Sequence, residues 1–196
     1  MNVTVIGAGN SGIAMAAHLS KEGHKVTLWN RSSSTISKLI ETRVIHCTGI
    51  INGSIPIHAV TNDMRVALED PDVVLITTPA NSHKELAELI AKNIRKSSVI
   101  VLNPGRTFGA LEFSNIYKKF NTDYEQIIAE TQTIIYTCRK IAEDAVNIFA
   151  LKNAVLISSL DTDRIIDYLP ECIREFFKPA KSMIQTSIGN VGMVLH

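Results

Sequence analysis

Short apolar runs alternate along the first half of the chain with longer segments in which apolar residues recur every three or four positions. The short runs are rich in β-branched residues and predict buried parallel strands, whereas the longer segments predict helices. The predicted strands are residues 2–7, 24–30, 71–80 and 97–105. The predicted helices are residues 11–23, 31–42, 62–70 and 82–96. Strands that alternate with helices predict a parallel sheet with right-handed crossovers.

A hairpin and a more mixed second half complete the pattern. Residues 44–60 carry two β-rich runs around Asn52-Gly53, which is a hairpin signal. Further β-rich segments are residues 125–141, 145–160 and 181–188, and the further predicted helices are residues 108–120 and 161–177, the second of them interrupted at Pro170. The whole pattern predicts an α/β protein with a doubly wound Rossmann fold, in which a mostly parallel sheet gains extra β-strands in the second half.

Composition fits an ordinary globular protein and narrows the range of partners. The chain has 196 residues, 45% of them apolar and 20% charged, with a formal net charge of +1. This balance predicts neither nucleic acid nor a membrane as a partner, and no apolar run approaches the roughly 18–20 residues that span a bilayer. The first residues lack the basic start of a signal peptide. The three cysteines are far apart without a C-x-x-C pair, so we expect a reduced, cytoplasmic protein without disulfides or a metal site.

The strongest local motif is a G-x-G-x-x-G sequence formed by Gly7, Gly9 and Gly12, between the first predicted strand and helix. Gly7 permits a tight turn, Gly9 lets the backbone approach a pyrophosphate, and Gly12 lets the helix pack closely on the strand. Asn10 and Ser11 fall at the helix N-terminus, where free N–H groups attract phosphate. We therefore predict that these five residues bind a dinucleotide, with a purely structural glycine turn as the alternative.

The residues after the second predicted strand bear on the choice of cofactor. An NAD site usually has an acidic residue there, but this chain has Asn30 and Arg31, followed by Ser32 and Ser33, with no acid nearby in the sequence. Arg31 and the hydroxyl groups are suited to a 2′-phosphate, which favours NADP. The alternative is NAD, with Arg31 stacked on the adenine.

The third predicted strand ends in the sequence TTPA, at the expected switch point of the sheet. The backbone of Thr78 and Pro79 is therefore expected to line the dinucleotide crevice. His83 follows in the next helix, either as a functional residue or as a helix N-terminal residue with a solvated ring.

Two later segments, NPGRTFGALEF at 103–113 and ETQTIIYTCR at 130–139, resemble the octopine and nopaline dehydrogenases, the opine dehydrogenase family. The N-terminal segment is similar both to that family and to the related glycerol-3-phosphate dehydrogenases. The resemblance implies an N-terminal Rossmann domain, a C-terminal helical domain and an active site between them. It implies reductive condensation of an amino acid with a 2-oxo acid, usually pyruvate, with NADH or NADPH reducing the imine. The rivals are a glycerol-3-phosphate or 2-oxo acid dehydrogenase and a non-catalytic dinucleotide-binding module.

Three residues in these segments are candidates for substrate binding. Arg106 is suited to the carboxylate of a 2-oxo acid, and its alternative is a surface arginine in a turn. The resemblance implies that Thr133 contacts the substrate or the nicotinamide and that Cys138 lies near the nicotinamide; a buried apolar thiol is the alternative for Cys138. Glu130 and Gln132 are expected either to line a site or to face solvent.

The resemblance assigns the proton transfer to His196, the last of six histidines, which follows a segment containing Asn190. In the family, an aspartate from the C-terminal domain orients this histidine; the alternative is a terminal residue without a role. We therefore predict an NAD(P)-binding domain at residues 1–190 and, at 191–196, the start of a connection to a helical domain that this sequence lacks. We expect the isolated 196-residue chain to bind the cofactor but to have little or no enzymatic activity. The sequence leaves open whether the chain is a truncation, one part of a split enzyme or a complete module, and whether it forms a homodimer.

Overall fold

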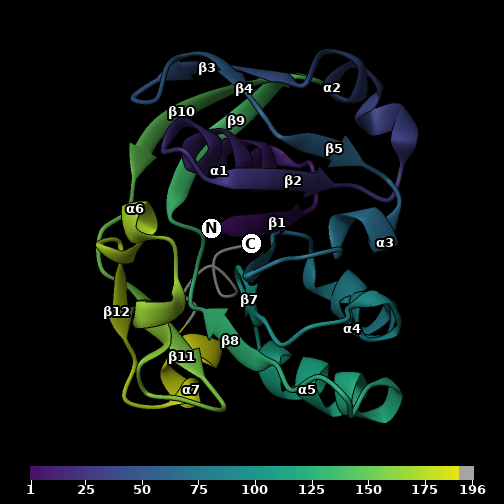
Figure 1. Ribbon diagram of the computed structural model, residues 1–196. Helices are drawn as coiled ribbons and strands as arrows, with labels where there is room; N and C mark the ends of the chain where they lie inside the picture. Colours follow the sequence, from purple (N-terminus) through teal and green to yellow (C-terminus); the bar gives the residue numbers. More distant parts are fainter. Residues whose placement is uncertain (190–196) are drawn as a thin grey trace.

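An eight-stranded sheet forms the centre of the computed structural model, which describes residues 1–189 (Figure 1). From one edge to the other, the strands are β12 (Phe177–Pro179), β11 (Val155–Ser159), β8 (Ile127–Thr131), β7 (Val99–Leu102), β6 (Val73–Ile76), β1 (Asn2–Ile6), β2 (Lys25–Trp29) and β5 (Ala59–Thr61). All neighbouring pairs are parallel except β8 and β11. Every residue of β6 and β7 is buried, as expected for strands covered on both faces.

The six strands from β5 to β8 have the order 3-2-1-4-5-6 of a dinucleotide-binding fold. The predicted doubly wound Rossmann fold is therefore confirmed. One face of the sheet carries α3 (Met64–Ala67), α4 (His83–Asn93) and α5 (Gly109–Phe120), which share one hydrophobic core. The other face carries α1 (Asn10–Lys21) and a second core. None of the helices in residues 1–189 has the length and apolar character needed to cross a membrane.

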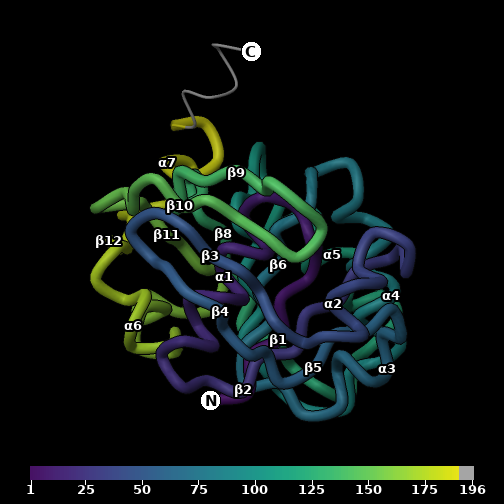
Figure 2. Tube along the Cα trace, turned by 90° about the horizontal axis from the view of Figure 1, so that it is seen from above, coloured from purple at the N-terminus to yellow at the C-terminus, as the bar shows by residue number. Residues whose placement is uncertain are grey.

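A second sheet of four strands lies over α1 (Figure 2). Its order is β4 (Gly53–Pro56), β3 (Val44–Gly49), β10 (Ala145–Leu151) and β9 (Tyr136–Ala142). The antiparallel β3–β4 pair confirms the predicted hairpin, and the parallel pairing of β3 with β10 joins segments about a hundred residues apart. Buried residues of this sheet, such as Ile45 and Val146, belong to the same core as α1. The extra β-strands of the second half are thus divided between the two sheets.

Three helical segments differ from the sequence prediction. The helix expected over 31–42 is a single 3-10 turn, η1 (Ser33–Thr35), followed by the short α2 (Ser37–Thr42), and no hydroxyl caps either of them. The segment 161–177 contains only η3 (Ile165–Tyr168) and α6 (Glu171–Arg174), separated at Pro170. The predicted strand at 181–188 is wrong, because α7 (Met183–Ser187) forms there. Thr186 and Ser187 are both buried, and adjacent residues of a strand would point to opposite faces.

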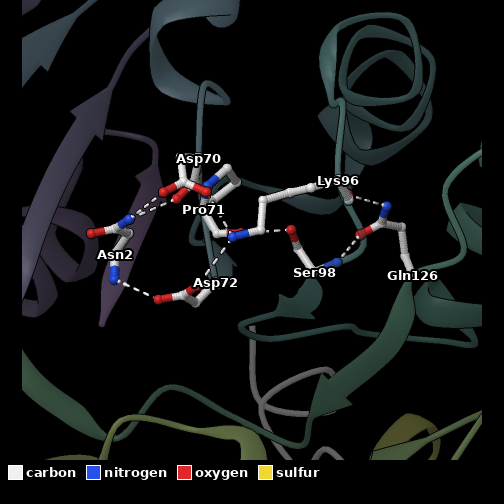
Figure 3. A network of polar contacts seen from close by, with 7 residues as sticks. All are labelled: Asn2, Asp70, Pro71, Asp72, Lys96, Ser98 and Gln126. Carbon is white, nitrogen blue, oxygen red and sulfur yellow. Dashed lines mark hydrogen bonds and ion pairs between the residues drawn. The ribbon is translucent and has the colours of Figure 1, made fainter.

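A polar network fixes the amino ends of the central strands, at the edge of the sheet opposite the glycine loop (Figure 3). The Lys96 ammonium lies 2.7 Å from a carboxylate oxygen of Asp70 and 3.2 Å from one of Asp72. The backbone N–H of Asn2 donates to Asp72, and the Ser98 N–H donates to Gln126, both at 2.8 Å. These bonds tie the starts of β1, β6, β7 and β8 together.

His18 lies inside α1, and its ring is buried. Its Nδ1 atom lies 3.0 Å from the hydroxyl oxygen of Tyr136 on β9. Burial lowers the pKa of His18, and the nearby Glu22 opposes this shift only in part. The ring therefore joins α1 to the second sheet as a neutral group.

We expect replacement of His18 by glutamine to cost more stability at pH 7.5 than at pH 5. The folded-state pKa of His18 lies below the unfolded value of about 6.5, so the unfolded chain binds the proton first. The contribution of His18 to stability is thus present above pH 6.5 and is lost as the pH falls towards the folded-state value. Urea unfolding of both proteins at the two pH values measures this difference. An equal cost at both would contradict the prediction.

Candidate functional site

The turn between β1 and α1 brings three glycines into three different environments. Gly7 has a φ of +104°, a left-handed conformation that favours glycine. A β-carbon on Gly12 would stand 1.8 Å from the carbonyl oxygen of Gly7, so the helix reaches the strand only because residue 12 has no side chain. A β-carbon on Gly9 would meet nothing within 4 Å. The backbone at Gly9 is thus open to a bound group.

The first turn of α1 presents N–H groups without a side-chain partner. Gly9 is the N-cap residue and supplies no side-chain hydrogen bond, and the first turn contains no acidic residue. Asn10 and Ser11 begin the helix at this point. The free N–H groups and the positive end of the helix dipole together favour an anion such as a phosphate.

Polar side chains at the carboxyl ends of the neighbouring strands hold this turn. The Asn30 side-chain oxygen, just beyond β2, accepts a hydrogen bond from the Ala8 N–H at 3.1 Å. The Thr77 hydroxyl, just beyond β6, donates to the carbonyl oxygen of Ile6 at 2.9 Å. Thr78 follows and accepts a hydrogen bond from the Ser82 hydroxyl at 2.7 Å. Because the chain order reverses between β1 and β6, this edge is the switch point where such folds bind ligands.

The loop after β2 contains an ion pair that the sequence did not suggest. A guanidinium nitrogen of Arg31 lies 2.7 Å from a carboxylate oxygen of Glu85 on α4, and both side chains are more than half exposed. The expectation of no acid near Arg31 holds along the sequence but not in space, since Glu85, 54 positions away in the chain, lies beside it. No local signal in the sequence indicates this contact.

The expectation of a solvated ring at His83 is also wrong. The side chain is buried, and its Nε2 atom lies 3.3 Å from the carbonyl oxygen of Thr78, as for an Nε2–H donor. Burial lowers the pKa of His83 more than the Thr78 hydrogen bond raises it, so the ring is neutral at pH 7. His83 thus fixes the backbone next to the exposed Pro79 at the switch point.

The loop after β7 places Arg106 in an unusual backbone conformation. Its φ of +61° is left-handed, which is uncommon for a residue with a side chain. The side chain is half-buried, and Arg106 forms no ion pair with any carboxylate of residues 1–189. Strained residues of this kind cluster at functional sites. A cation held in this way is available to a carboxylate ligand.

Glu130, at the carboxyl half of β8, neither lines an open site nor faces solvent. Its side chain is fully buried, and one carboxylate oxygen accepts the Ala110 N–H at 2.9 Å. The other oxygen accepts the hydroxyls of Thr186, at 2.7 Å, and of Ser187. A β-carbon on Gly105 would lie 2.3 Å from that of Glu130. Glu130 therefore anchors the Arg106 loop, the start of α5 and α7.

The remaining predicted substrate residues lie in two different places. The Thr133 hydroxyl accepts a hydrogen bond from the Lys152 ammonium at 3.3 Å. The Cys138 thiol contacts the carbonyl oxygen of Asn10 at 3.3 Å, and burial raises its pKa to about 11. Cys138 is therefore a neutral thiol beside the glycine loop. Asn190 and His196 lie outside the described residues.

The comparisons with known proteins agree with this geometry. Residues 2–111, more than half of the chain, match the family model of the NAD-dependent glycerol-3-phosphate dehydrogenase N-terminus. The chain belongs to this family. Membership indicates a nicotinamide dinucleotide as cofactor, and the open glycine turn fits its pyrophosphate.

Two curated relatives show how far the similarity extends. An opine dehydrogenase of Arthrobacter sp. (strain 1C) is 32% identical over 98% of the chain, which spans 54% of that protein. A glycerol-3-phosphate dehydrogenase of Thermoanaerobacter sp. (strain X514) is 32% identical over 53% of the chain and 31% of its own length. The chain thus spans about half the length, or less, of these relatives. The predicted resemblance to both groups within the family is confirmed.

Solved structures share the fold at low sequence identity. Octopine dehydrogenase in complex with NADH and agmatine has a TM-score of 0.81 at 17% identity, covering 99% of this chain and 52% of that one. Yersinopine dehydrogenase with NADP+ bound has a TM-score of 0.69 at 17% identity, covering 91% and 47%. In both cases the likeness covers about half of the solved chain and shows a shared fold.

We expect replacement of Glu130 by alanine to lower the free energy of unfolding by about 3 kcal/mol or more, because one N–H and two hydroxyls lose their buried acceptor. Glu130→Gln retains one acceptor oxygen and should lose about half as much. Urea unfolding measures both values. The control is Glu125→Ala at an exposed position, with an expected change within about 0.5 kcal/mol. A Glu130→Ala variant as stable as this control would contradict the anchoring role.

Proposed function

We propose that this chain is the cofactor-binding part of an opine dehydrogenase-type oxidoreductase. The reaction is the NAD(P)H-dependent reductive condensation of an amino acid with a 2-oxo acid such as pyruvate. The main support for this proposal is how much of the chain is similar to an opine dehydrogenase. The Arthrobacter opine dehydrogenase matches 98% of the chain, through the Arg106 loop and β9, whereas the glycerol-3-phosphate dehydrogenase match covers 53%.

The geometry supports separate roles for the residues around the switch point. The open turn at Gly9 and the first N–H groups of α1 bind the pyrophosphate. Thr78 and Pro79 line the place of the nicotinamide, and His83 holds the Thr78 backbone from behind. When bound, the reduced nicotinamide supplies a hydride for the imine carbon. Arg106 binds the carboxylate of the 2-oxo acid.

The remaining roles rest on the family resemblance. Thr133 supports the 2-oxo acid, and Cys138 packs beside the cofactor as a neutral thiol. His196 transfers the proton, and a C-terminal helical domain supplies its aspartate partner and most of the amino acid site. These roles follow from the family resemblance.

A glycerol-3-phosphate dehydrogenase is the second candidate, because the family model and several relatives carry that description. The two candidates differ in the second substrate. An opine dehydrogenase needs an amine together with a 2-oxo acid, whereas the alternative enzymes reduce a carbonyl without one.

For the protein that carries this domain together with the helical domain, we expect oxidation of NADPH or NADH to require both an amino acid and a 2-oxo acid. Arg106→Ala should raise KM for the 2-oxo acid by about 10-fold or more, since a charge-assisted bond to its carboxylate is lost. Arg106→Lys should lose less, and cofactor affinity should stay unchanged in both. Absorbance at the nicotinamide band measures the rates.

The proton-transfer role has its own readout in the same assay. His196→Gln should lower kcat with little change in cofactor affinity. Amine-independent oxidation, or robust turnover by the 196-residue chain alone, would contradict the opine dehydrogenase proposal.

The choice between NADP and NAD is tested at the Arg31–Glu85 pair. We expect Arg31→Ala to weaken NADPH binding by about 10-fold and to leave NADH binding nearly unchanged. Glu85→Gln should strengthen NADPH binding by about 2-fold or more, because an exposed ion pair worth about 0–1 kcal/mol no longer competes with the 2′-phosphate. Fluorescence titration of the nicotinamide gives both constants. An equal loss for the two cofactors in Arg31→Ala would support NAD.

A further inference from the structure

Lys140 reaches the glycine loop from a strand outside the Rossmann sheet. It lies on β9, and its backbone N–H donates to the Asn10 side-chain oxygen at 2.8 Å. Its ammonium nitrogen lies 3.2 Å from the carbonyl oxygen of Ala8. Together with the contact of Cys138 to the Asn10 carbonyl, these bonds fix the β9–β10 hairpin to the turn between β1 and α1.

The charge of Lys140 is poorly satisfied by the residues around it. An ammonium group can donate three hydrogen bonds, and this one, half-buried, has a single neutral carbonyl as its hydrogen-bond partner among residues 1–189. Glu143 and Asp144 attract it only from a distance, because Glu143 accepts from the Lys38 N–H and Asp144 pairs with the Lys38 ammonium at 2.8 Å. Burial lowers the pKa of Lys140, and the two carboxylates offset this shift only in part.

The position of this cation relates it to the anion site. Both polar backbone groups of Ala8 are occupied, the N–H by Asn30 and the carbonyl by Lys140. The next residue, Gly9, faces open space, and the first turn of α1 is uncapped. The ammonium therefore lies at the rim of the place where a pyrophosphate meets the helix N-terminus, with two donors to spare.

We propose that Lys140 is a cofactor-binding residue whose ammonium group contacts the pyrophosphate of the nicotinamide dinucleotide. The inference rests on the cofactor-binding part of the proposed function and adds a residue that lies far from the glycine loop in sequence. The second sheet then has a role in binding, because it delivers this cation to the loop. The 2′-phosphate is a different group, expected beyond β2 beside Arg31.

The test uses the 196-residue chain and compares Lys140→Gln with Lys140→Arg. The matched control is Lys178→Gln, which removes one exposed positive charge on β12 at the far edge of the main sheet. We expect Lys140→Gln to weaken NADH, NADPH and ADP-ribose by about 10-fold each, Lys140→Arg by much less, and Lys178→Gln by less than about 2-fold. Added salt should weaken binding to the wild type more than to Lys140→Gln. Isothermal titration measures these constants.

A second measurement needs no variant and holds if Lys140→Gln fails to fold. In the wild-type chain, NADH should protect Lys140 from acetylation by acetic anhydride and leave Lys178 equally reactive, as read by mass spectrometry. Equal labelling of Lys140 with and without NADH would overturn the proposal.

The other outcomes are equally distinct. The proposal would be overturned if the Lys140→Gln variant bound NADH as tightly as the wild type does. It would also be overturned if the variant lost affinity for NADPH alone, because that result would assign Lys140 to the 2′-phosphate. A wild-type chain that binds no dinucleotide would overturn this proposal together with the cofactor site. An absence of amine-dependent turnover would count only against the opine reaction.

Discussion

The carbonyl oxygen of Gly7 and the α-carbon of Gly12 approach so closely that any side chain at position 12 would collide with the strand. This contact sets α1 against the end of β1, and the rest of the site depends on that placement. It directs the uncapped first turn of the helix to the edge of the sheet where the strand order reverses between β1 and β6. It also provides the surface on which the second sheet packs, since α1 and that sheet share one core. The same interaction therefore forms the anion site and places the second sheet beside it.

Glu130 provides a comparable fixed point at the other side of the site. Burying a carboxylate is costly unless its oxygens are hydrogen-bonded, and here an N–H and two hydroxyls supply the bonds, with no cation paired to it among residues 1–189. One donor lies at the start of α5 and the other two lie in α7, so the carboxylate joins these two helices, and Gly105 of the Arg106 loop packs closely against it. Arg106 itself forms no ion pair with Glu130 or with another carboxylate of residues 1–189.

The sequence predicts well what depends on local patterns and poorly what depends on distant contacts. The glycine motif, the Asn52-Gly53 hairpin and the periods of most strands and helices are local, and the structure has the corresponding elements. The helices predicted over 31–42 and 161–177 form only in short pieces. Other features depend on contacts between segments that lie apart in the sequence, and no short stretch of sequence predicts them. They are the pairing of β3 with β10, the burial of His83 and the Arg31–Glu85 ion pair. The strand predicted for 181–188 failed for a related reason. Its β-like residues Thr186 and Ser187 are needed as hydroxyl donors to Glu130, and only a helical turn buries both.

These long-range contacts change how the cofactor site should be understood. A sequence motif assigns dinucleotide binding to the β1–α1–β2 unit, roughly the first 30 residues. In this fold the glycine loop is also held by Asn10 contacts to β9, and the nearby half-buried cation comes from position 140. The β9–β10 hairpin is itself held in place by β3, through a parallel pairing of segments about a hundred residues apart. Cofactor affinity should therefore depend on the folding of the second sheet. If the β9–β10 hairpin were destabilised, the Lys140 ammonium would no longer lie beside the glycine loop, even though the three glycines were unchanged.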